Sequence, residues 1–333
     1  MPMNVLVAVR DRVLVVDACR GEVRDAVVPA GRGDELRPTC LGADPLVAGR
    51  AWCGTEAHGV LRSDDGGRSW RAMGLDRDEI TAVAASPVEA GLVWVGTEPS
   101  ALWRSGDGGE SWERAEGLGE LPSSSEWSFP PRPDTHHVRW IACHPREAGR
   151  LWLAIEAGAL VSTPDGGRSW RDRVAGGPYD THELAIHPER PDVLRVAAGD
   201  GYYESFDGGA TWASPEDGLE VGYLRSVAID PGDPGVVVVS AASHAHAAYR
   251  AGRSDGRLYR REGDGPWERV RDGWPDPPAT IAPLLAAGRE PGELWAADER
   301  GVHRSGGGGR RWEQLAAFEP TPPGLRGLAL SDR

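Results

Sequence analysis

Short runs of alternating apolar and polar residues fill the chain, and turn-forming residues separate them. In one representative stretch, four such runs begin at Thr81, Leu92, Ala101 and Ser111. A period of two is typical of strands that bury one face, and the intervening Gly, Pro, Asp and Ser residues are typical of tight turns. The pattern predicts an all-β chain of short antiparallel strands.

One signature, Ser/Thr-x-Asp-Gly-Gly-x-x-Trp, recurs along the sequence. The aspartate is kept in four copies, Gly307 replaces it in a fifth, and a degenerate sixth copy ends at Trp267; the five recognisable copies span residues 63–70, 105–112, 163–170, 205–212 and 305–312. Each repeat holds four strand-like runs, which is the composition of a β-propeller blade. The signature falls between the third and fourth runs.

The signature residues have a structural interpretation. Gly-Gly supplies the positive φ angles of a tight hairpin, and the Ser and Asp side chains can bond nearby backbone amides. We expect the tryptophan to pack under the next blade. The repeated Ser and Asp residues are therefore predicted to hold turns rather than ligands.

The chain ends predict how many blades there are. Near the N-terminus, runs at residues 13–16 and 22–28 resemble the outer part of a blade without its innermost strand, whereas residues 325–330 resemble an innermost strand with nothing after it. The C-terminal strand would complete the N-terminal blade. We predict a seven-bladed β-propeller of four-stranded blades that forms a single domain over residues 1–333.

Charge excludes several function classes. The 37 basic residues are all arginine, and against 51 acidic residues they give a net charge of −14. Without lysine there is no Schiff-base, pyridoxal-phosphate or phosphate-loop amine. The acidic balance also disfavours a nucleic-acid surface.

The location of the protein is predicted from three features. The N-terminus lacks a signal-peptide pattern, and no apolar stretch approaches a membrane span. The four cysteines fit neither a metal site nor a disulfide framework, although Cys40 and Cys53 could face each other on neighbouring strands. We expect free thiols and a cytoplasmic protein.

The tandem signature resembles the BNR, or Asp-box, repeat, and the resemblance covers nearly the whole chain. It implies a propeller fold. Propellers of this kind include sialidases and other glycoside hydrolases, sortilin-type receptors and photosystem assembly factors, so the resemblance leaves the function open.

Ligands of propellers usually bind in an axial funnel lined by the starts of the innermost strands. Most innermost strands end just before a proline, so the residue six positions before that proline occupies an equivalent place in each blade. The residues at this first-strand register are Thr39, Thr81, Arg139, His182, Arg225 and, from the closing strand, Arg326. The three arginines could hold an anionic or sugar-like ligand. An arginine at this place would be costly to bury unpaired.

A second register follows the aromatic residues of the second strands. In four blades a glutamate lies four residues after this aromatic; these are Glu56, Glu98, Glu156 and Glu299. In the intervening blade the acidic residue, Asp200, comes one position later than this spacing and lies near Tyr202 in the sequence. They could form a ring of carboxylates. The alternative is a turn sequence copied between blades, with each glutamate solvated or bonded to a loop amide.

Two long segments, residues 117–137 and 240–257, should shape the funnel mouth. The first holds His137 and a proline-rich portion that suggests a stiff lid, and the second holds His244. His144 and His187 precede prolines where other blades have Asp or Ser, so we predict that they cap turns.

Three functions remain open from the sequence. In a glycoside hydrolase, Glu156 and His182 or Glu183 would exchange protons with a ligand held by the three arginines. A sialidase would likewise use three arginines to hold the carboxylate of its sugar. This sequence has no Arg-Ile-Pro-like motif, and no Tyr/Glu nucleophile pair can be assigned, although Tyr179, Tyr202 and Tyr223 are candidates for the tyrosine.

The second function resembles the metal-dependent lyase propellers, with His137, His182, His244 and Glu156 around a divalent ion. No fixed spacing supports this alternative, and no cofactor is otherwise predicted. The third is a non-catalytic scaffold that presents its loops to a protein or glycan. The expected partner is thus a small molecule, a glycan or a protein, and whether the chain is an enzyme stays open.

Overall fold

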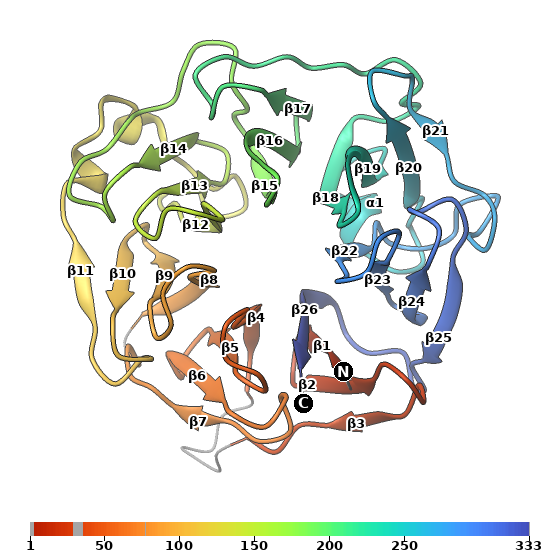
Figure 1. Cartoon of the computed structure of the whole chain (residues 1–333), viewed down its shortest axis with the longest axis horizontal. Coiled ribbons are helices and arrows are strands. Elements are labelled where there is room, and N and C mark those ends of the chain that lie inside the picture. Colours follow the sequence, from red (N-terminus) through yellow and green to blue (C-terminus); the bar gives the residue numbers. More distant parts are fainter. Residues whose placement is uncertain (1–2, 29–35, 77, 333) are drawn as a thin grey trace. The chain divides into compact units, whose positions relative to one another are not determined.

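The computed structural model describes residues 3–28, 36–76 and 78–332, and these residues form seven antiparallel sheets (Figure 1). The chain is an all-β, seven-bladed β-propeller, as the sequence predicts. Blade 1 combines both ends of the chain, because β26 (Leu325–Asp332) is hydrogen-bonded to β1 (Met3–Val9), which precedes β2 (Val13–Asp17) and β3 (Val23–Asp25). The predicted completion of the N-terminal blade by the C-terminal strand is confirmed.

The other blades follow in chain order. Blade 2 contains β4 (Pro38–Ala43), β5 (Ala51–Thr55), β6 (Val60–Ser63) and β7 (Arg71–Ala72). Blade 3 contains β8 (Glu79–Ala85), β9 (Val93–Glu98), β10 (Leu102–Ser105) and β11 (Glu113–Ala115). Blade 4 contains β12 (Val138–Cys143), β13 (Leu151–Ile155) and β14 (Ala159–Thr163). Blade 5 contains β15 (Thr181–His187), β16 (Arg190–Ala198) and β17 (Gly201–Ser205). Blade 6 contains β18 (Tyr223–Asp230), β19 (Asp233–Ala242), β20 (Arg257–Glu262) and β21 (Glu268–Arg269). Blade 7 contains β22 (Leu284–Ala287), β23 (Leu294–Asp298), β24 (Gly301–Ser305) and β25 (Glu313–Ala317).

Blades 4 and 5 differ from the predicted four strands. Each forms three strands, and a single isolated bridge marks the fourth position, between Ser162 and Arg171 in blade 4 and between Glu204 and Ala213 in blade 5. The few helical turns are short: η1 (Leu118–Glu120), η2 (Pro122–Glu126) and α1 (Ala245–Tyr249). In the described part of the chain, no helix has the length and hydropathy needed to span a membrane.

Packing divides the chain into two compact units. The first contains Met1–Arg173 and Arg326–Arg333, and the second contains Val174–Leu325. Blades 1 to 4 belong to the first unit and blades 5 to 7 to the second, apart from Leu325 at the start of β26. The single domain over residues 1–333 stays a prediction.

The repeated signature builds the hairpins as predicted. In blade 2, the Ser63 hydroxyl accepts a hydrogen bond from the Gly67 N–H (2.9 Å), and Asp65 Oδ1 accepts from the Arg68 and Ser69 N–H groups (3.0 and 2.9 Å). Gly66 and Gly67 have φ angles of 74° and 85°, which a residue with a Cβ rarely adopts. These turn roles are confirmed.

The signature tryptophans pack in the direction opposite to the predicted one. Trp112 of blade 3 donates its indole N–H to the Met73 carbonyl of blade 2 (2.8 Å), and Trp170 of blade 4 donates to the Glu116 carbonyl at the end of blade 3 (2.8 Å). These two tryptophans therefore bond to the preceding blade. Sequence spacing could not give this direction, because it depends on the twist of each sheet.

The predicted turn caps are confirmed. The His144 ring nitrogen Nδ1 accepts from the Arg146 N–H (3.1 Å), and His187 Nδ1 accepts from the Glu189 N–H (3.2 Å). Asp44 Oδ1 makes the same bond to the Leu46 N–H in blade 2 (2.9 Å). These histidines replace an Asp or Ser because an imidazole nitrogen can accept the same backbone bond.

All four cysteines are free thiols. Burial raises the pKa of the Cys40 thiol to about 11 and that of Cys143 to about 12. Both thiols therefore stay protonated at neutral pH and act as small apolar side chains.

The signature aspartates predict a pH dependence of stability. The Ser111 hydroxyl, followed by the Ser111 N–H, lowers the pKa of Asp107 to about 2. Since the unfolded pKa is about 3.9, ionised Asp107 stabilises the fold above that pH, and this contribution is lost as the pH falls toward about 2. We expect Asp107→Asn to be less stable than the wild type at pH 5, with the difference narrowing between about pH 4 and 2 in thermal unfolding. A difference that stays constant over that range would contradict the assignment.

Candidate functional site

The first-strand register has a common structural basis, which is a β-bulge. The ladder between the first and second strands skips one residue in blades 2 to 6, and the skipped residues are Thr39, Thr81, Arg139, His182 and Arg225. A bulge re-aims the side chain of its extra residue. The register inferred from the prolines is thus a set of structurally equivalent positions.

Four of the five bulge residues donate a hydrogen bond to a backbone carbonyl beyond their own sheet. Thr39 donates to the Ile80 carbonyl, Thr81 to the Val138 carbonyl (2.7 Å) and His182 to the Leu224 carbonyl (2.6 Å). Each acceptor is the residue just before the next bulge. These side chains fasten neighbouring blades.

Arg225 extends this pattern. The side chain is buried, and its guanidinium donates to the carbonyls of Ala282 (2.7 Å) and Leu325 (2.8 Å), with a longer contact to Ala248 (3.5 Å). Its plane also lies over the Tyr249 ring, 4.5 Å from the centroid. The carbonyls supply the partners that a buried arginine needs, so these contacts describe a bridge between backbone segments rather than a ligand clamp.

In the first unit, one group of predicted residues is brought together around His137. The imidazole is 6% exposed; its Nε2 lies 2.9 Å from Glu156 Oε2 and its Nδ1 lies 3.5 Å from Glu98 Oε2. Arg139 Nε lies 3.3 Å from the same Glu156 oxygen. One histidine thus sits between two carboxylates, a combination that can hold and move a proton.

The two carboxylates of this cluster differ in environment. Burial, and then the neighbouring Glu79, raises the pKa of Glu98, while Arg132 and His137 oppose the rise. Glu156 is more open, with 15% of its side chain exposed. Buried and open carboxylates side by side are the usual basis of acid and base roles.

The segment 117–137 is held against this cluster. Arg132 forms ion pairs with Glu98 (2.6 Å) and Glu79 (3.2 Å), and the Phe129 ring lies edge-on to His137 with centroids 4.7 Å apart. Trp127 is buried in the apolar core of blades 3 and 4. Sequence reasoning missed Arg132 and Glu79 as members of the cluster; the only signal was an arginine within the proline-rich portion.

In the second unit, His182 and Tyr223 form a second polar group. Because a carbonyl can only accept, the bond to Leu224 requires a proton on His182 Nδ1. The other nitrogen faces the Tyr223 hydroxyl (3.3 Å) and the Asp180 carboxylate (3.7 Å). Glu183 is buried and accepts from the Ser226 hydroxyl, which itself accepts from the Leu285 N–H (2.9 Å). Glu156 belongs to the first unit, whereas His182 and Glu183 belong to the second.

The remaining loop carboxylates bind a nearby backbone amide, an arginine or a tyrosine hydroxyl. Glu56 pairs with Arg37 (3.2 Å), Glu299 accepts from the Ile281 N–H (3.1 Å), and Asp200 accepts from the Tyr203 hydroxyl (2.9 Å). Burial raises the pKa of Glu299. These contacts match the alternative in which the repeated turn sequence is structural.

Three other predicted site residues differ in burial and contacts. Tyr202 is fully buried in the core of blades 5 and 6 and bonds Glu204 (3.1 Å), which corrects its expected place beside a ligand, since strand alternation points it inward. His244 is exposed and caps α1 by accepting from the Ala247 N–H (3.3 Å). Arg326 is exposed on β26.

The residues of the metal alternative each have hydrogen-bond partners of their own. His137 and Glu156 contact each other directly, and the cap bond of His244 uses the lone pair that a metal ion would need. His182 Nδ1 is protonated by its carbonyl bond. The three histidines of the metal alternative therefore have different partners: His137 contacts a carboxylate, His182 bonds a backbone carbonyl, and His244 caps a helix.

Comparison with known proteins concerns the fold alone. No protein-family model matches the sequence, and no curated protein matches it either. Among solved structures, YCF48 bound to D1 peptide is similar over 83% of this chain and 81% of its own (TM-score 0.58, 19% identity), and YCF48 from Cyanidioschyzon merolae over 91% and 97% (TM-score 0.62, 14% identity). The GH74 xyloglucanase from Xanthomonas campestris is similar over 99% of this chain but 52% of its own (TM-score 0.69, 17% identity).

These similarities agree with the seven sheets and support a β-propeller. The chain spans about half the length of the GH74 enzyme and most of the length of the YCF48 chains. Neighbours of one fold thus include a glycoside hydrolase and a peptide-bound protein, and fold alone does not choose between them.

Proposed function

We propose that the protein is a non-catalytic binding propeller whose partner is a polypeptide. The observation that carries the proposal is that carboxylates predicted for the site already bond to other side chains of the protein. Glu98 pairs with Arg132, Glu156 with His137, and Glu183 with Ser226. Groups held in this way are suited to a rigid surface. The length match to a peptide-bound propeller supports the same class.

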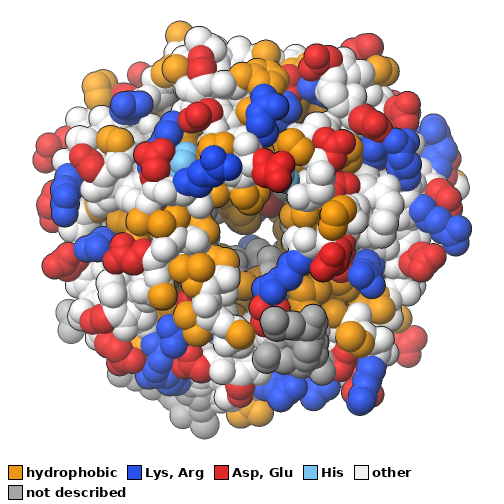
Figure 2. Space-filling view, viewed as in Figure 1, with side chains coloured by type: hydrophobic (Ala, Val, Ile, Leu, Met, Phe, Trp, Pro, Cys, Tyr) orange, Lys and Arg blue, Asp and Glu red, His pale blue; other side chains and the backbone are white. Residues whose placement is uncertain are grey.

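The Asp-box resemblance belongs to this proposal. Four signature copies with the aspartate make the same turn, and the family that they resemble includes assembly factors and receptors as well as hydrolases. In the space-filling view, acidic and basic side chains are interspersed over the visible face (Figure 2). A mixed surface of this kind suits a protein partner with charges of both signs.

A second candidate is hydrolysis of a sugar-like ligand at the His137 cluster. The raised pKa of Glu98 favours it, because a protonated Glu98 could donate to the leaving oxygen while Glu156 takes a proton from water. Arg139, which pairs with Glu156, stays a predicted ligand residue in this candidate. His137 stands between the two carboxylates, where an inverting enzyme would need room for water.

Turnover assays separate the two candidates. We expect no hydrolysis above background on a panel of chromogenic glycosides, with or without added Mg²⁺ or Mn²⁺, and saturable binding of peptides selected from a random display library. Hydrolysis that is lost in both Glu98→Gln and Glu156→Gln, but kept in the exposed loop control Glu56→Gln, would overturn the binding proposal. Such activity should also fall as the pH rises above the raised pKa of Glu98, because the acid would lose its proton.

A further inference from the structure

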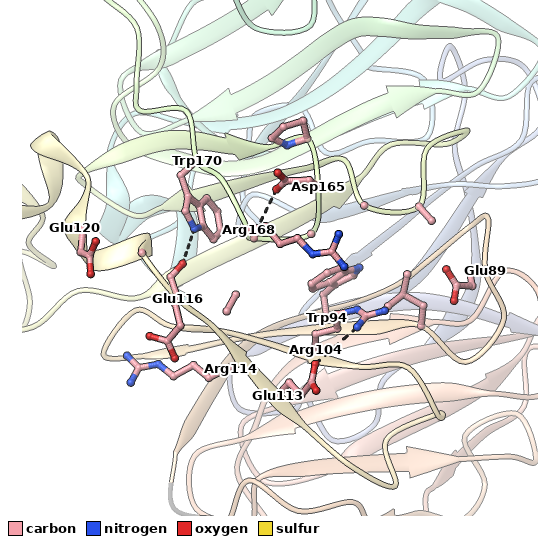
Figure 3. A pocket seen from close by; sticks show the side chains of 18 residues that line it. Glu89, Trp94, Arg104, Glu113, Arg114, Glu116, Glu120, Asp165, Arg168 and Trp170 are labelled. Atoms are coloured by element: carbon pink, nitrogen blue, oxygen red, sulfur yellow. Dashed lines mark hydrogen bonds and ion pairs between the residues drawn. The ribbon is translucent and has the colours of Figure 1, made fainter.

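A groove of about 710 Å³ lies between blades 3 and 4 in the first unit (Figure 3). One wall comes from β9 to β11 and the turn after them, and the other comes from the signature hairpin of blade 4. Its charged and aromatic side chains include Trp94, Arg104, Glu113, Arg168 and Trp170. None of the site residues predicted from the sequence lines the groove.

Two equivalent seams elsewhere are closed by opposite charges. Between blades 2 and 3, Arg62 donates to the Gly108 carbonyl of the next signature hairpin, and Glu110 of that hairpin pairs with Arg71 (3.1 Å). Arg62 itself reaches Glu110 at 3.4 Å. The strand arginine and the hairpin glutamate thus fasten the two blades.

The seam between blades 6 and 7 is closed in the same way. Arg260 Nε donates to the Gly308 carbonyl (2.8 Å), and Glu262 pairs with Arg310 of the hairpin. In both seams a carboxylate neutralises the arginine that reaches across. Closing therefore depends on one acidic partner at each seam.

The seam between blades 3 and 4 breaks this rule. Arg104 stands at the strand position of Arg62 and Arg260, but Gly106 takes the place of the carboxylates that follow those arginines, Asp64 and Glu262. The hairpin position of blade 4 carries a second arginine, Arg168. Arg104 stacks on Trp94, 5.8 Å from the ring centroid, and its nearest carboxylate is the exposed Glu113 of its own blade at 3.9 Å. No ion pair of the Arg168 guanidinium occurs among the residues that the structure describes.

Figure 3 shows the Arg104 and Arg168 side chains both extending to the neighbourhood of Trp94. Two guanidinium groups cannot neutralise each other, so this seam lacks the carboxylate that its two counterparts have. A carboxylate from another molecule would supply the missing partner, because arginine binds carboxylates through paired, charge-assisted hydrogen bonds.

The rest of the groove defines the kind of molecule that carries this carboxylate. The outermost strand of its sheet is β11, so one edge of β11 has no neighbouring strand, and its residues line the groove. An extended peptide can add to such an edge. Three further glutamates line the walls and would repel a polyanion; they are Glu89, Glu116 and Glu120.

We propose that this groove binds an extended peptide segment with a single acidic side chain, whose carboxylate pairs with Arg104 and Arg168 while its backbone lies along β11. The proposal rests on the proposed binding function and names the surface and the chemistry of the partner. Trp170, at the groove wall, would contact the residues that flank the acid.

The test uses a blocked pentapeptide with one central glutamate between valines, its glutamine counterpart, and inorganic phosphate. The full chain is labelled with 5-fluorotryptophan, and the Trp94 and Trp170 signals are assigned with Trp→Phe variants. We expect a saturable shift of these two signals with the glutamate peptide, and binding at least about tenfold weaker with the glutamine peptide. Phosphate that binds as tightly as the peptide would overturn the proposal in favour of a small-anion site.

A matched pair of variants locates the binding. Arg168→Glu recreates the arginine–glutamate seam of blades 2 and 3, so it should keep or raise the melting temperature while weakening peptide binding at least about tenfold. Arg68→Glu makes the same charge change at the same hairpin position of blade 2 and should leave binding unchanged. Equal weakening by both variants would indicate a general charge effect and overturn the site.

The groove and the proposed function fail in different ways. If display-selected peptides bind but the Arg168→Glu change leaves their affinity intact, the protein is a peptide binder that uses another surface, and the groove proposal is wrong. Glycoside turnover that depends on Glu98 and Glu156 would instead overturn the proposed function.

Discussion

Replacing Glu204 with glutamine is expected to lower the free energy of unfolding by about 3–5 kcal/mol. The Glu204 side chain is 6% exposed and forms ion pairs with two buried arginines, Arg195 of its own blade and Arg261 of blade 6 (2.8 Å). Removal of the charge would leave both guanidinium groups buried without a carboxylate. Arg195 Nε and Arg261 Nη1 already lack hydrogen-bond partners among the described residues. Urea-induced unfolding measures the effect.

Glu262→Gln is the matched control for this change. Glu262 also contacts two arginines, Arg260 and Arg310, but it is 55% exposed. An exposed ion pair contributes little to stability, so we expect only a small change in the free energy of unfolding. Similar losses of unfolding free energy in the two variants would show that burial does not determine how much the Glu204 ion pairs stabilise the fold.

Gly273→Ala is expected to cost at least about 3 kcal/mol of unfolding free energy. Gly273 has a φ of 74°, and a Cβ built there would lie 1.7 Å from the Trp312 carbonyl oxygen. The left-handed conformation costs a residue with a Cβ about 1–2 kcal/mol. The remaining loss would come from pushing apart two backbone segments, since the obstacle is a carbonyl rather than a flexible side chain.

Gly176→Ala separates these two contributions. Gly176 has nearly the same φ, 76°, but a Cβ there would meet no atom within 4 Å. We expect it to cost about 1–2 kcal/mol, which is the conformational part alone. If thermal and urea unfolding gave equal losses for the two variants, steric overlap at Gly273 would play no part.

Repetition made much of the fold predictable. The signature fixed the hairpins, and the incomplete N-terminal blade predicted that β26 would pair with β1. The prolines marked equivalent first-strand residues, which the structure identifies as bulges. These features are local, so each copy of the repeat carries the information needed to recognise it.

The candidate site was less predictable because its chemistry depends on what each side chain meets. Arg139 and Arg225 share one register, yet the first meets the Glu156 carboxylate and the second meets backbone carbonyls. Tyr202 neighbours an exposed loop in sequence but points into the core. The groove lined by Arg104 and Arg168 was not predicted either; its signal in the sequence is Gly106, which stands where Asp64 and Glu262 follow the strand arginines of blades 2 and 6.

The sequence by itself determined the strand pattern, the hairpin chemistry, the blade count and the turn caps, because these depend on residues that are neighbours along the chain or repeat at a fixed spacing. Tertiary structure decided which blades Trp112 and Trp170 bond, which carboxylates lie beside His137, and where the groove with two arginines forms. The physical reason is that the partners of these charged and aromatic side chains come from the adjacent blade. The carbonyls that Trp112 and Trp170 bond, for example, are more than 30 residues away along the chain. Only packing brings such residues within the few ångströms at which they interact.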